Sequence, residues 1–288
     1  MRIGAVLPHN EIGTDPGAIT AYLQGLEEMG VTHLLAYDHV LGADPNRPGG
    51  WDGPYDKDVA FHEPLTFFGF AAGVTSHIEL VSAVLILPQR QAVLVAKQAA
   101  EVAVLSGGRL RLGVGVGWNQ IEYQGLAEDF TTRGRRQGEQ VELMHRLWTE
   151  DSVSFDGEFH TVDRASINPR PAAPIPVWFG GAAPALLERC GRLGDGWIPL
   201  GKPNESSRSR LATIHRHREA AGRASEPFAV QAQAQYRGGD PERWRSHAEQ
   251  WRDLGATHLA VATHNASPTD VDGHLQRVAE YQEAVSDL

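Results

Sequence analysis

Short apolar runs alternate with amphipathic segments along the whole chain, and this alternation is the main guide to its fold. The first apolar run covers residues 2–7. After it, Asp15-Pro16 places an N-cap residue before a proline at the first helical position. Ile19 and Leu23 then recur at the spacing of one helix face. The same order of strand and helix repeats to the end of the chain, which predicts about eight strand–helix units.

The expected strands are apolar runs without a polar face, and each precedes an expected helix. The strands cover residues 2–7, 31–36, 78–87, 111–116, 176–179, 196–198, 228–234 and 257–262. The helices cover residues 16–29, 64–73, 92–105, 132–149, 184–193, 205–221, 241–254 and 271–285. Buried strands that alternate with helices indicate a parallel sheet covered by helices, and about eight units favour a closed (β/α)8 TIM barrel over an open doubly wound sheet. We expect one α/β barrel domain over residues 1–288, because no linker, composition break or internal repeat divides the chain.

Two segments do not fit the simple strand–helix repeat. Residues 41–61 form a long polar stretch rich in Gly, Pro and Asp, and loops of this length are usually functional or mobile. We expect this insertion at the C-terminal face of the barrel, where the loops after the strands lie. Asp156-Gly157 predicts a small hairpin over residues 153–162.

Glycines remove side chains from the strand expected over residues 111–116. Gly113, Gly115 and Gly117 occupy every second position of one face. A glycine weakens a strand, so glycines in a strand often mark the close approach of a ligand or of another backbone. Two interpretations stay open: a flat ligand lies against the C-terminal end of this strand, or the strand packs tightly in the barrel.

Net charge, cysteine content and the lack of long apolar segments limit the expected partners and location of the protein. The formal net charge of −10 disfavours nucleic acid, whose phosphates require a basic surface. Cys190 is the single cysteine, so no intramolecular disulfide can form. No segment approaches the roughly 20 apolar residues that span a membrane, and no signal peptide is visible. We expect a cytoplasmic protein with a small-molecule substrate and with no nucleic-acid or membrane partner.

The candidate chemistry lies at the C-terminal ends of the expected strands, where barrel active sites form. Asp38-His39 follows the second strand and is the strongest candidate for a catalytic pair, because histidine can act as an acid or a base near neutral pH. The alternative is a histidine that only caps a loop through hydrogen bonds. Metal catalysis is not indicated, since the histidines are scattered, and no lysine lies on a strand to form a Schiff base.

The turn Gly180-Gly181-Ala182-Ala183 leads from the fifth strand into a helix. Its small side chains leave the backbone N–H groups of Gly181, Ala182 and Ala183 free at a helix N-terminus, which is a favourable place for a phosphate. The alternative is a short, tight connection. Barrels more often hold phosphate after strands seven and eight, which makes residues 262–265 the competing loop.

Several motifs together resemble the luciferase-like monooxygenase superfamily of flavin and deazaflavin oxidoreductases. They occur in the order of that family and cover most of the chain. The matching segments are Asp38-His39, 84–90, 96–99, 105–109, 113–119, 176–181 and 194–199.

The resemblance implies a barrel that holds FMN or coenzyme F420 at its C-terminal mouth, and Asp38-His39 is typical of the F420-using branch. There, Asp38 and His39 lie beside the reactive ring as the catalytic pair, and Asp38 also contacts the cofactor. A non-prolyl cis peptide is expected at Leu85-Ile86. The implied cofactor-binding residues are Asp38, Leu85, Ile86, Gly115, Val116, Gly117, Trp118, Gly180, Gly181, Ala182 and Ala183.

One departure from the family pattern bears on the substrate. In the sugar-phosphate dehydrogenases of this branch a catalytic Glu follows the glycines of the fourth strand, and here Trp118 stands there. Trp118 and Trp51 indicate an apolar or aromatic substrate instead; the alternative is that Trp118 is a packing residue. We therefore favour an F420-dependent oxidoreductase, with a possible homodimer. The alternatives are an FMN-dependent monooxygenase that uses reduced flavin and oxygen, and a barrel that binds a cofactor or ligand without catalysis.

Overall fold

Eight parallel strand positions close into a barrel, as the alternating pattern predicts. The computed structural model describes residues 1–267 and 269–288. The barrel strands are β1 (Arg2–Val6), β2 (His33–Ala36), β3 (Glu79–Ser82) with β4 (Leu85–Ile86), β5 (Leu110–Gly115), β8 (Val177–Gly180), β9 (Gly196–Ile198), β10 (Ala229–Gln235) and β11 (His258–Ala262). Their order is β3-β2-β1-β11-β10-β9-β8-β5-β4, and pairing of β3 with β5 closes the ring. The expected (β/α)8 fold is confirmed.

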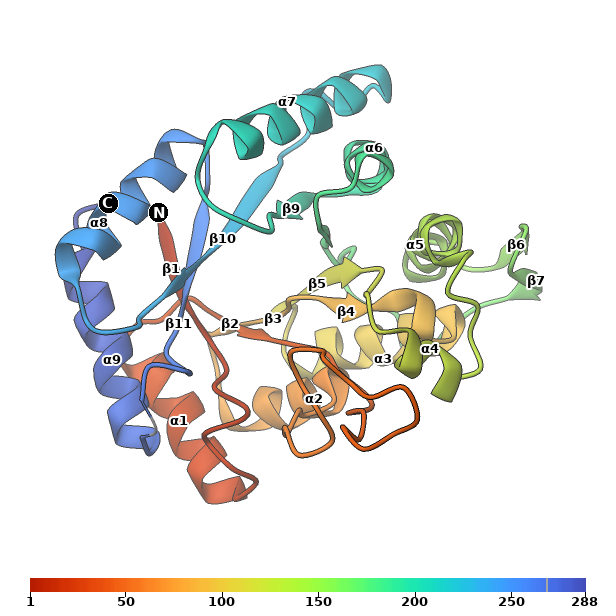
Figure 1. Cartoon of the computed structure of the whole chain (residues 1–288). Helices are drawn as coiled ribbons and strands as arrows, with labels where there is room; N and C mark the ends of the chain where they lie inside the picture. The colour runs from red at the N-terminus through yellow and green to blue at the C-terminus, as the bar shows by residue number, and fades with distance from the viewer. Residues whose placement is uncertain (268) are drawn as a thin grey trace.

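Helices surround the barrel on its outside (Figure 1). They are α1 (Pro16–Glu28), α2 (Pro64–Val74), α3 (Ala92–Leu105), α5 (Arg133–Thr149), α6 (Pro184–Leu193), α7 (Glu205–Ala220), α8 (Pro241–Asp253) and α9 (Val271–Ala284). Several begin as the sequence predicts: Asp15, for example, caps α1 by accepting the N–H of Ala18 at 2.8 Å. Across the described ranges, no helix combines the length and apolar character needed to cross a bilayer.

The third barrel position differs from the single strand expected over residues 78–87. It is divided into β3 and β4, and the turn η1 (Leu87–Gln89) follows. The non-prolyl cis peptide lies between these two segments, at Ala83-Val84, and not at Leu85-Ile86 as expected. Leu85 and Ile86 pair in regular register with Val114 and Gly115 of β5, so the irregular backbone lies two residues earlier.

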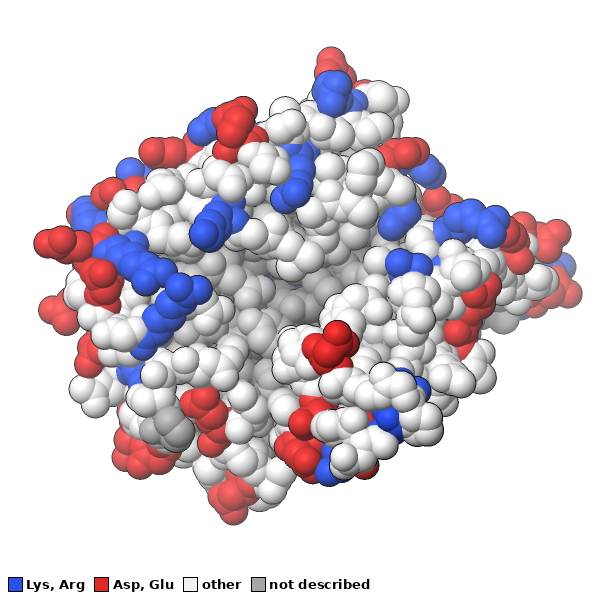
Figure 2. Space-filling model, in the orientation of Figure 1, with Lys and Arg blue, Asp and Glu red and all other residues white. Residues whose placement is uncertain are grey.

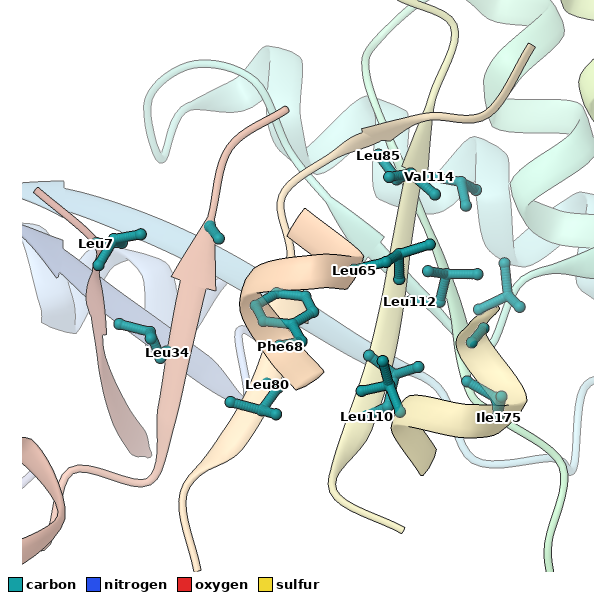
Figure 3. Packing of buried hydrophobic residues seen from close by; sticks show 14 of the residues in the cluster. Leu7, Leu34, Leu65, Phe68, Leu80, Leu85, Leu110, Leu112, Val114 and Ile175 are labelled. Carbon is teal, nitrogen blue, oxygen red and sulfur yellow. The ribbon is translucent and has the colours of Figure 1, made fainter. Parts of the chain in front are cut away.

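The main core lies between the strands and the helices. Figure 3 shows leucines of β2, β3 and β5 packed on the same side as Leu65 and Phe68 of α2, and Leu34, Leu80 and Phe68 have no exposed surface. A smaller cluster fills the inside of the barrel. Its members are Val6, Leu35, Val81, Ala260 and Ala262, with Tyr37 and Ala83 packed on it.

Two insertions extend the loops after β2 and β5. In Figure 1, residues 41–61 lie beyond the end of β2 and over α2, and the hairpin of β6 (Val153–Asp156) and β7 (Thr161–Ala165) projects beyond α5. A short helix, α4 (Gln120–Gly125), follows β5 and was not expected. The space-filling view shows a hollow at the centre of the face that carries residues 41–61 (Figure 2).

Candidate functional site

The side chain of His39 lies at the C-terminal end of β2, where a carboxylate holds it. Its Nδ1 lies 3.1 Å from Oε1 of Glu122 on α4. Its ring centroid lies 6.2 Å from that of Trp118, which follows β5. The fold therefore brings two predicted site residues, His39 and Trp118, to the same part of the mouth.

Glu122 is a site residue that the sequence analysis missed. Its side chain is 1% exposed. It accepts the N–H of Val40 at 3.0 Å and the side-chain amide of Gln89 at 3.1 Å. Burial alone would raise the pKa of Glu122, but the hydrogen bonds from His39, Gln89 and Val40 outweigh burial and hold this pKa below its usual value. Only a faint sequence signal exists, because the helix that carries Glu122 is a single short segment capped by Asn119.

Asp38 faces the protein and not the mouth. Its Oδ2 accepts the N–H of Ile86 at 2.8 Å, and its Oδ1 pairs with Arg90 at 2.8 Å. Arg90 also pairs with Glu63 at 2.8 Å. Burial raises the pKa of Asp38, and the neighbouring guanidinium opposes that shift. With no exposed side-chain surface, Asp38 fixes the ends of β2 and β4 against each other. Its direct contact with a cofactor stays a prediction.

An aromatic cluster surrounds His39; it consists of Trp51, Tyr55, Phe61 and Trp118. The ring centroids of Tyr55 and Phe61 lie 4.5 and 4.6 Å from that of His39. Trp51 stacks on Trp118 at 5.8 Å with an interplanar angle of 22°. Three of the four rings come from residues 41–61, so the insertion supplies most of the apolar wall, and Trp118 remains 46% exposed.

A cavity of about 270 Å³ opens beside His39. Residues of the insertion and the start of α4 line it: Val40, Leu41, Gly42, Tyr55, Asp56, Lys57, Val59, Ala60, Phe61 and Asn119. The turn 180–183 is not part of this lining. The pocket at His39 and the predicted phosphate turn are therefore separate parts of the mouth.

Two further histidines lie at the ends of β1 and β11. The ring of His9 lies 4.2 Å from that of Phe61 and 6.1 Å from that of His264. Burial lowers the pKa of His9 to about 4, so its ring is neutral near pH 7. Nδ1 of His9 lies 3.1 Å from the carbonyl of Leu7 and must donate to it. The opposite nitrogen of His9 is thus an acceptor. The position of His9 at the end of the first strand made it a candidate in the sequence, but no motif assigned it a role.

The space beside the glycines of β5 and β8 is occupied by residues at the third barrel position. A Cβ at Gly115 or at Gly180 would overlap the side chain of Val84, and a Cβ at Gly113 would overlap the backbone carbonyl of Ser82. Gly117 has a φ of +65°, a conformation that favours glycine. Of the two interpretations left open by the sequence, these contacts support tight packing within the barrel.

The turn from β8 to α6 keeps only part of the predicted donor set. The N–H of Gly181 donates to the carbonyl of Ile198 at 3.2 Å, so it is already used, contrary to the expectation. The N–H groups of Ala182 and Ala183 have no acceptor among the described residues. Ala183 is exposed and is the N-cap of α6, where it supplies no side-chain hydrogen bond. These two donors at a helix N-terminus remain suited to an anion.

The other predicted cofactor contacts differ in how accessible they are. Leu85 is fully buried in the main core, and Ile86 is 7% exposed and packs where a Cβ of Gly117 would lie. Val116 is half-buried, and its carbonyl accepts the hydroxyl of Tyr123 at 2.7 Å. The structure therefore brings the ends of β2, β4, β5 and β8 together, but Leu85 offers no surface to a ligand.

Sequence comparison gives a family and several relatives. Residues 1–287 match the family described as luciferase-like monooxygenase. An uncharacterized protein of Mycobacterium bovis is 34% identical over 217 residues, 75% of this chain and 74% of that protein. The F420-dependent glucose-6-phosphate dehydrogenase of Amycolatopsis mediterranei is 31% identical over 202 residues, 69% of this chain and 57% of that protein. The F420-dependent hydroxymycolic acid dehydrogenase of Mycobacterium tuberculosis is 26% identical over 281 residues, 96% and 72% respectively.

Solved structures share the architecture at low sequence identity. An F420-dependent secondary alcohol dehydrogenase in complex with an F420-acetone adduct superposes with a TM-score of 0.81 and 18% identity, over 99% of both chains. A coenzyme F420-dependent tetrahydromethanopterin reductase from Methanopyrus kandleri gives a TM-score of 0.74 and 16% identity, over 99% of this chain and 98% of that one. These likenesses establish the barrel fold.

Proposed function

The chain belongs to the luciferase-like monooxygenase family, and on that premise we propose that it is a coenzyme F420-dependent oxidoreductase. Its reaction would be hydride transfer between the deazaflavin and a small apolar or aromatic substrate. The observation that carries the proposal is His39, which combines a fixed ring, an adjacent cavity and an aromatic wall at the mouth. Two relatives described as F420-dependent dehydrogenases support the choice of cofactor.

The cofactor would rest on accessible groups at the strand ends and at the start of α6. The N–H groups of Ala182 and Ala183, which have no acceptor among the described residues, suit its phosphate. Val116, Gly117 and Gly180 are partly exposed at the strand ends and would lie against its ring. When bound, a deazaflavin supplies the hydride chemistry, and the protein supplies orientation and exclusion of water.

His39 is the residue proposed to handle the substrate's polar group. Nδ1 is held by Glu122, whereas Nε2 has no hydrogen-bond partner among the described residues. His39 lines the cavity, so Nε2 is the atom available to bind a substrate oxygen and to take or give a proton there. The rings of Tyr55, Phe61 and Trp118 flank this position and would exclude water from it.

The surroundings of His39 favour an uncharged substrate. Among the described residues that line the cavity, Lys57 is the one Lys or Arg, and it pairs with Asp58 at 2.8 Å. Figure 2 shows Lys, Arg, Asp and Glu side chains on the rim of the hollow, whereas its visible walls are formed by other residues. Trp118 also replaces the Glu of the sugar-phosphate dehydrogenases that the chain resembles. We therefore do not propose glucose 6-phosphate, which the name of the Amycolatopsis relative gives as its substrate, as the substrate of this protein.

The direct test replaces His39 with alanine. His39→Ala is expected to lower turnover by about 10²–10⁴-fold, the usual contribution of a positioned proton-transfer group, with a much smaller change in F420 affinity. Turnover is followed by the absorbance of F420 with a panel of small apolar and aromatic alcohols and ketones. His77→Ala, at an exposed position before β3, is the control. Wild-type turnover in His39→Ala would refute the assigned role, and consumption of reduced FMN and oxygen instead would favour a monooxygenase.

The oligomeric state is a separate prediction. We propose that the protein forms a homodimer, and size-exclusion chromatography with light scattering tests this. A monomer at micromolar concentration would contradict it.

A further inference from the structure

Glu122 occupies a costly position for a carboxylate. Its side chain is 1% exposed, and an ionised group at such a site is tolerated only when hydrogen bonds replace its lost hydration. One oxygen, Oε1, receives His39 Nδ1 at 3.1 Å and the N–H of Val40 at 3.0 Å. The other, Oε2, receives the amide of Gln89 at 3.1 Å. Two segments of the mouth, residues 39–40 after β2 and η1, therefore meet at this one side chain of α4.

We propose that Glu122 is a positioning residue that fixes the tautomer of His39. The inference rests on the proposed function only in giving His39 a part in the reaction. An ionised carboxylate can accept hydrogen bonds but cannot donate them. Opposite Glu122, Nδ1 of neutral His39 must therefore carry the proton, and Nε2 must be the unprotonated nitrogen. His39 would meet the substrate with a proton acceptor, and the adjacent carboxylate would stabilise the ring once Nε2 has taken a proton.

The competing interpretation makes Glu122 a simple anchor for the insertion. It also accepts the N–H of Leu41 at 3.5 Å, and a Cβ at Gly125 of the same helix would overlap the side chain of Leu41. Glu122→Ala would remove both functions at once and could not separate them. A useful variant must keep the acceptor oxygen for the backbone and remove only the charge.

Glu122→Gln meets this requirement because of an unusual neighbour. Oε1 of Gln89 is buried and has no partner among the described residues. The new amide can keep its oxygen toward Val40 and, once the amide of Gln89 turns over, donate its N–H to the oxygen of Gln89. The loop anchor is then preserved and the same oxygen still accepts Nδ1–H of His39, so only the negative charge beside the ring is removed.

A second Glu–His pair provides a matched control away from the mouth. Glu139 on α5 lies 2.7 Å from Nδ1 of His160 and accepts the backbone N–H groups of Glu158 and Phe159 at 2.7 and 2.9 Å. It thus holds the β6–β7 hairpin much as Glu122 holds the insertion. Glu139→Gln removes the charge beside His160 in the same way, with the amide oxygen kept toward Phe159 and His160, and is expected to leave turnover unchanged.

The tautomer itself is measured by ¹H–¹⁵N correlation NMR of protein labelled at histidine, without cofactor. The signals of His39 are assigned by their loss in His39→Gln. In the neutral ring of the wild type we expect the proton on Nδ1. In Glu122→Gln we expect the proton to stay on Nδ1, because the amide oxygen that keeps Val40 also accepts Nδ1–H, and the variant loses only the charge that stabilises the protonated ring. With F420 present, kcat is expected to fall by about 10²-fold, while KM and F420 affinity change by less than about threefold.

The outcomes separate this inference from the proposed function. A wild-type His39 protonated on Nε2 overturns the inference without any variant, even if Glu122→Gln fails to fold. A Glu122→Gln variant with wild-type kcat overturns the part assigned to the charge of the carboxylate. If wild-type His39 carries its proton on Nδ1 as expected but F420 supports no turnover in the wild type, the inference about the tautomer stands and the proposed function fails.

Discussion

Val84 lies where the glycines of two neighbouring strands leave space, and this packing leads to a quantitative prediction. In Gly180→Ala, the added Cβ would lie less than 3.0 Å from Cγ1 of Val84, whereas ordinary contact begins at 3.4 Å. The φ of Gly180 is not in the left-handed region, so the backbone itself accepts alanine. The clash with Val84 alone decides the outcome.

The expected magnitude combines two opposing effects. Overpacking typically costs about 1–3 kcal/mol. Replacing glycine by alanine restricts the unfolded chain and returns about 0.4–1 kcal/mol. We therefore expect Gly180→Ala to lower the free energy of unfolding by about 1–2 kcal/mol, and to lower the Tm by a few degrees. Val84→Ala removes both γ methyl groups, so the double variant is expected to be more stable than the sum of the single effects predicts.

The assay is a double-variant cycle of unfolding free energies, measured without and with cofactor. Gly69→Ala is the matched control, because Gly69 lies inside α2 with no atom within 4 Å of an added Cβ. It is expected to be stabilising by about 0.5–1 kcal/mol. Additivity of Gly180→Ala and Val84→Ala within about 0.5 kcal/mol would refute the packing argument. Loss of cofactor binding with unchanged stability would also contradict the packing argument, and Gly180 would then serve only the contact with the cofactor ring proposed above.

Two further predictions concern the phosphate site and acid stability. Ala183→Asp adds an N-cap acceptor to α6 and is expected to stabilise the fold by about 0.5–2 kcal/mol, but its negative charge is expected to weaken F420 binding. Ala183→Asn adds the cap without the charge and should bind F420 as the wild type does. Equal F420 affinity of the two variants would place the phosphate elsewhere. The buried His9 has a pKa of about 4 when folded, below its ordinary 6.5, so its contribution is complete above about pH 6.5 and is lost as pH falls toward 4. This loss amounts to roughly 3 kcal/mol for His9 alone. The Tm of His9→Gln should therefore fall less steeply than that of the wild type as pH is lowered over that window. Identical dependence of Tm on pH in the two proteins would contradict this.

The sequence predicts the barrel well because its strands are buried on both faces. Apolar runs such as those of β5 and β11 can be assigned as strands without knowing which strand they pair with. The helices begin at capping residues close to where the sequence predicts them. The break between β3 and β4 is invisible in the same way, since residues 78–87 read as one apolar run. The helix α4 is too short to show a helical period.

The site is less predictable, because its side chains depend on contacts between distant segments. His39 stands out by residue type and position, but its partner Glu122 is 83 residues away in the chain. The same holds for Asp38 and Arg90, 52 residues apart. Sequence motifs could suggest that Asp38 acts at the ring, whereas only the fold shows both of its oxygens occupied within the protein.

The central claim is the identity of the cofactor, and titration of the purified protein tests it most directly. Oxidised F420 and FMN are added separately to the same preparation, and binding is followed by the fluorescence of each. We predict saturable binding of F420 that is tighter than that of FMN, and weaker F420 binding in Ala183→Asp than in Ala183→Asn. Micromolar binding of FMN with no response to F420 would contradict the account.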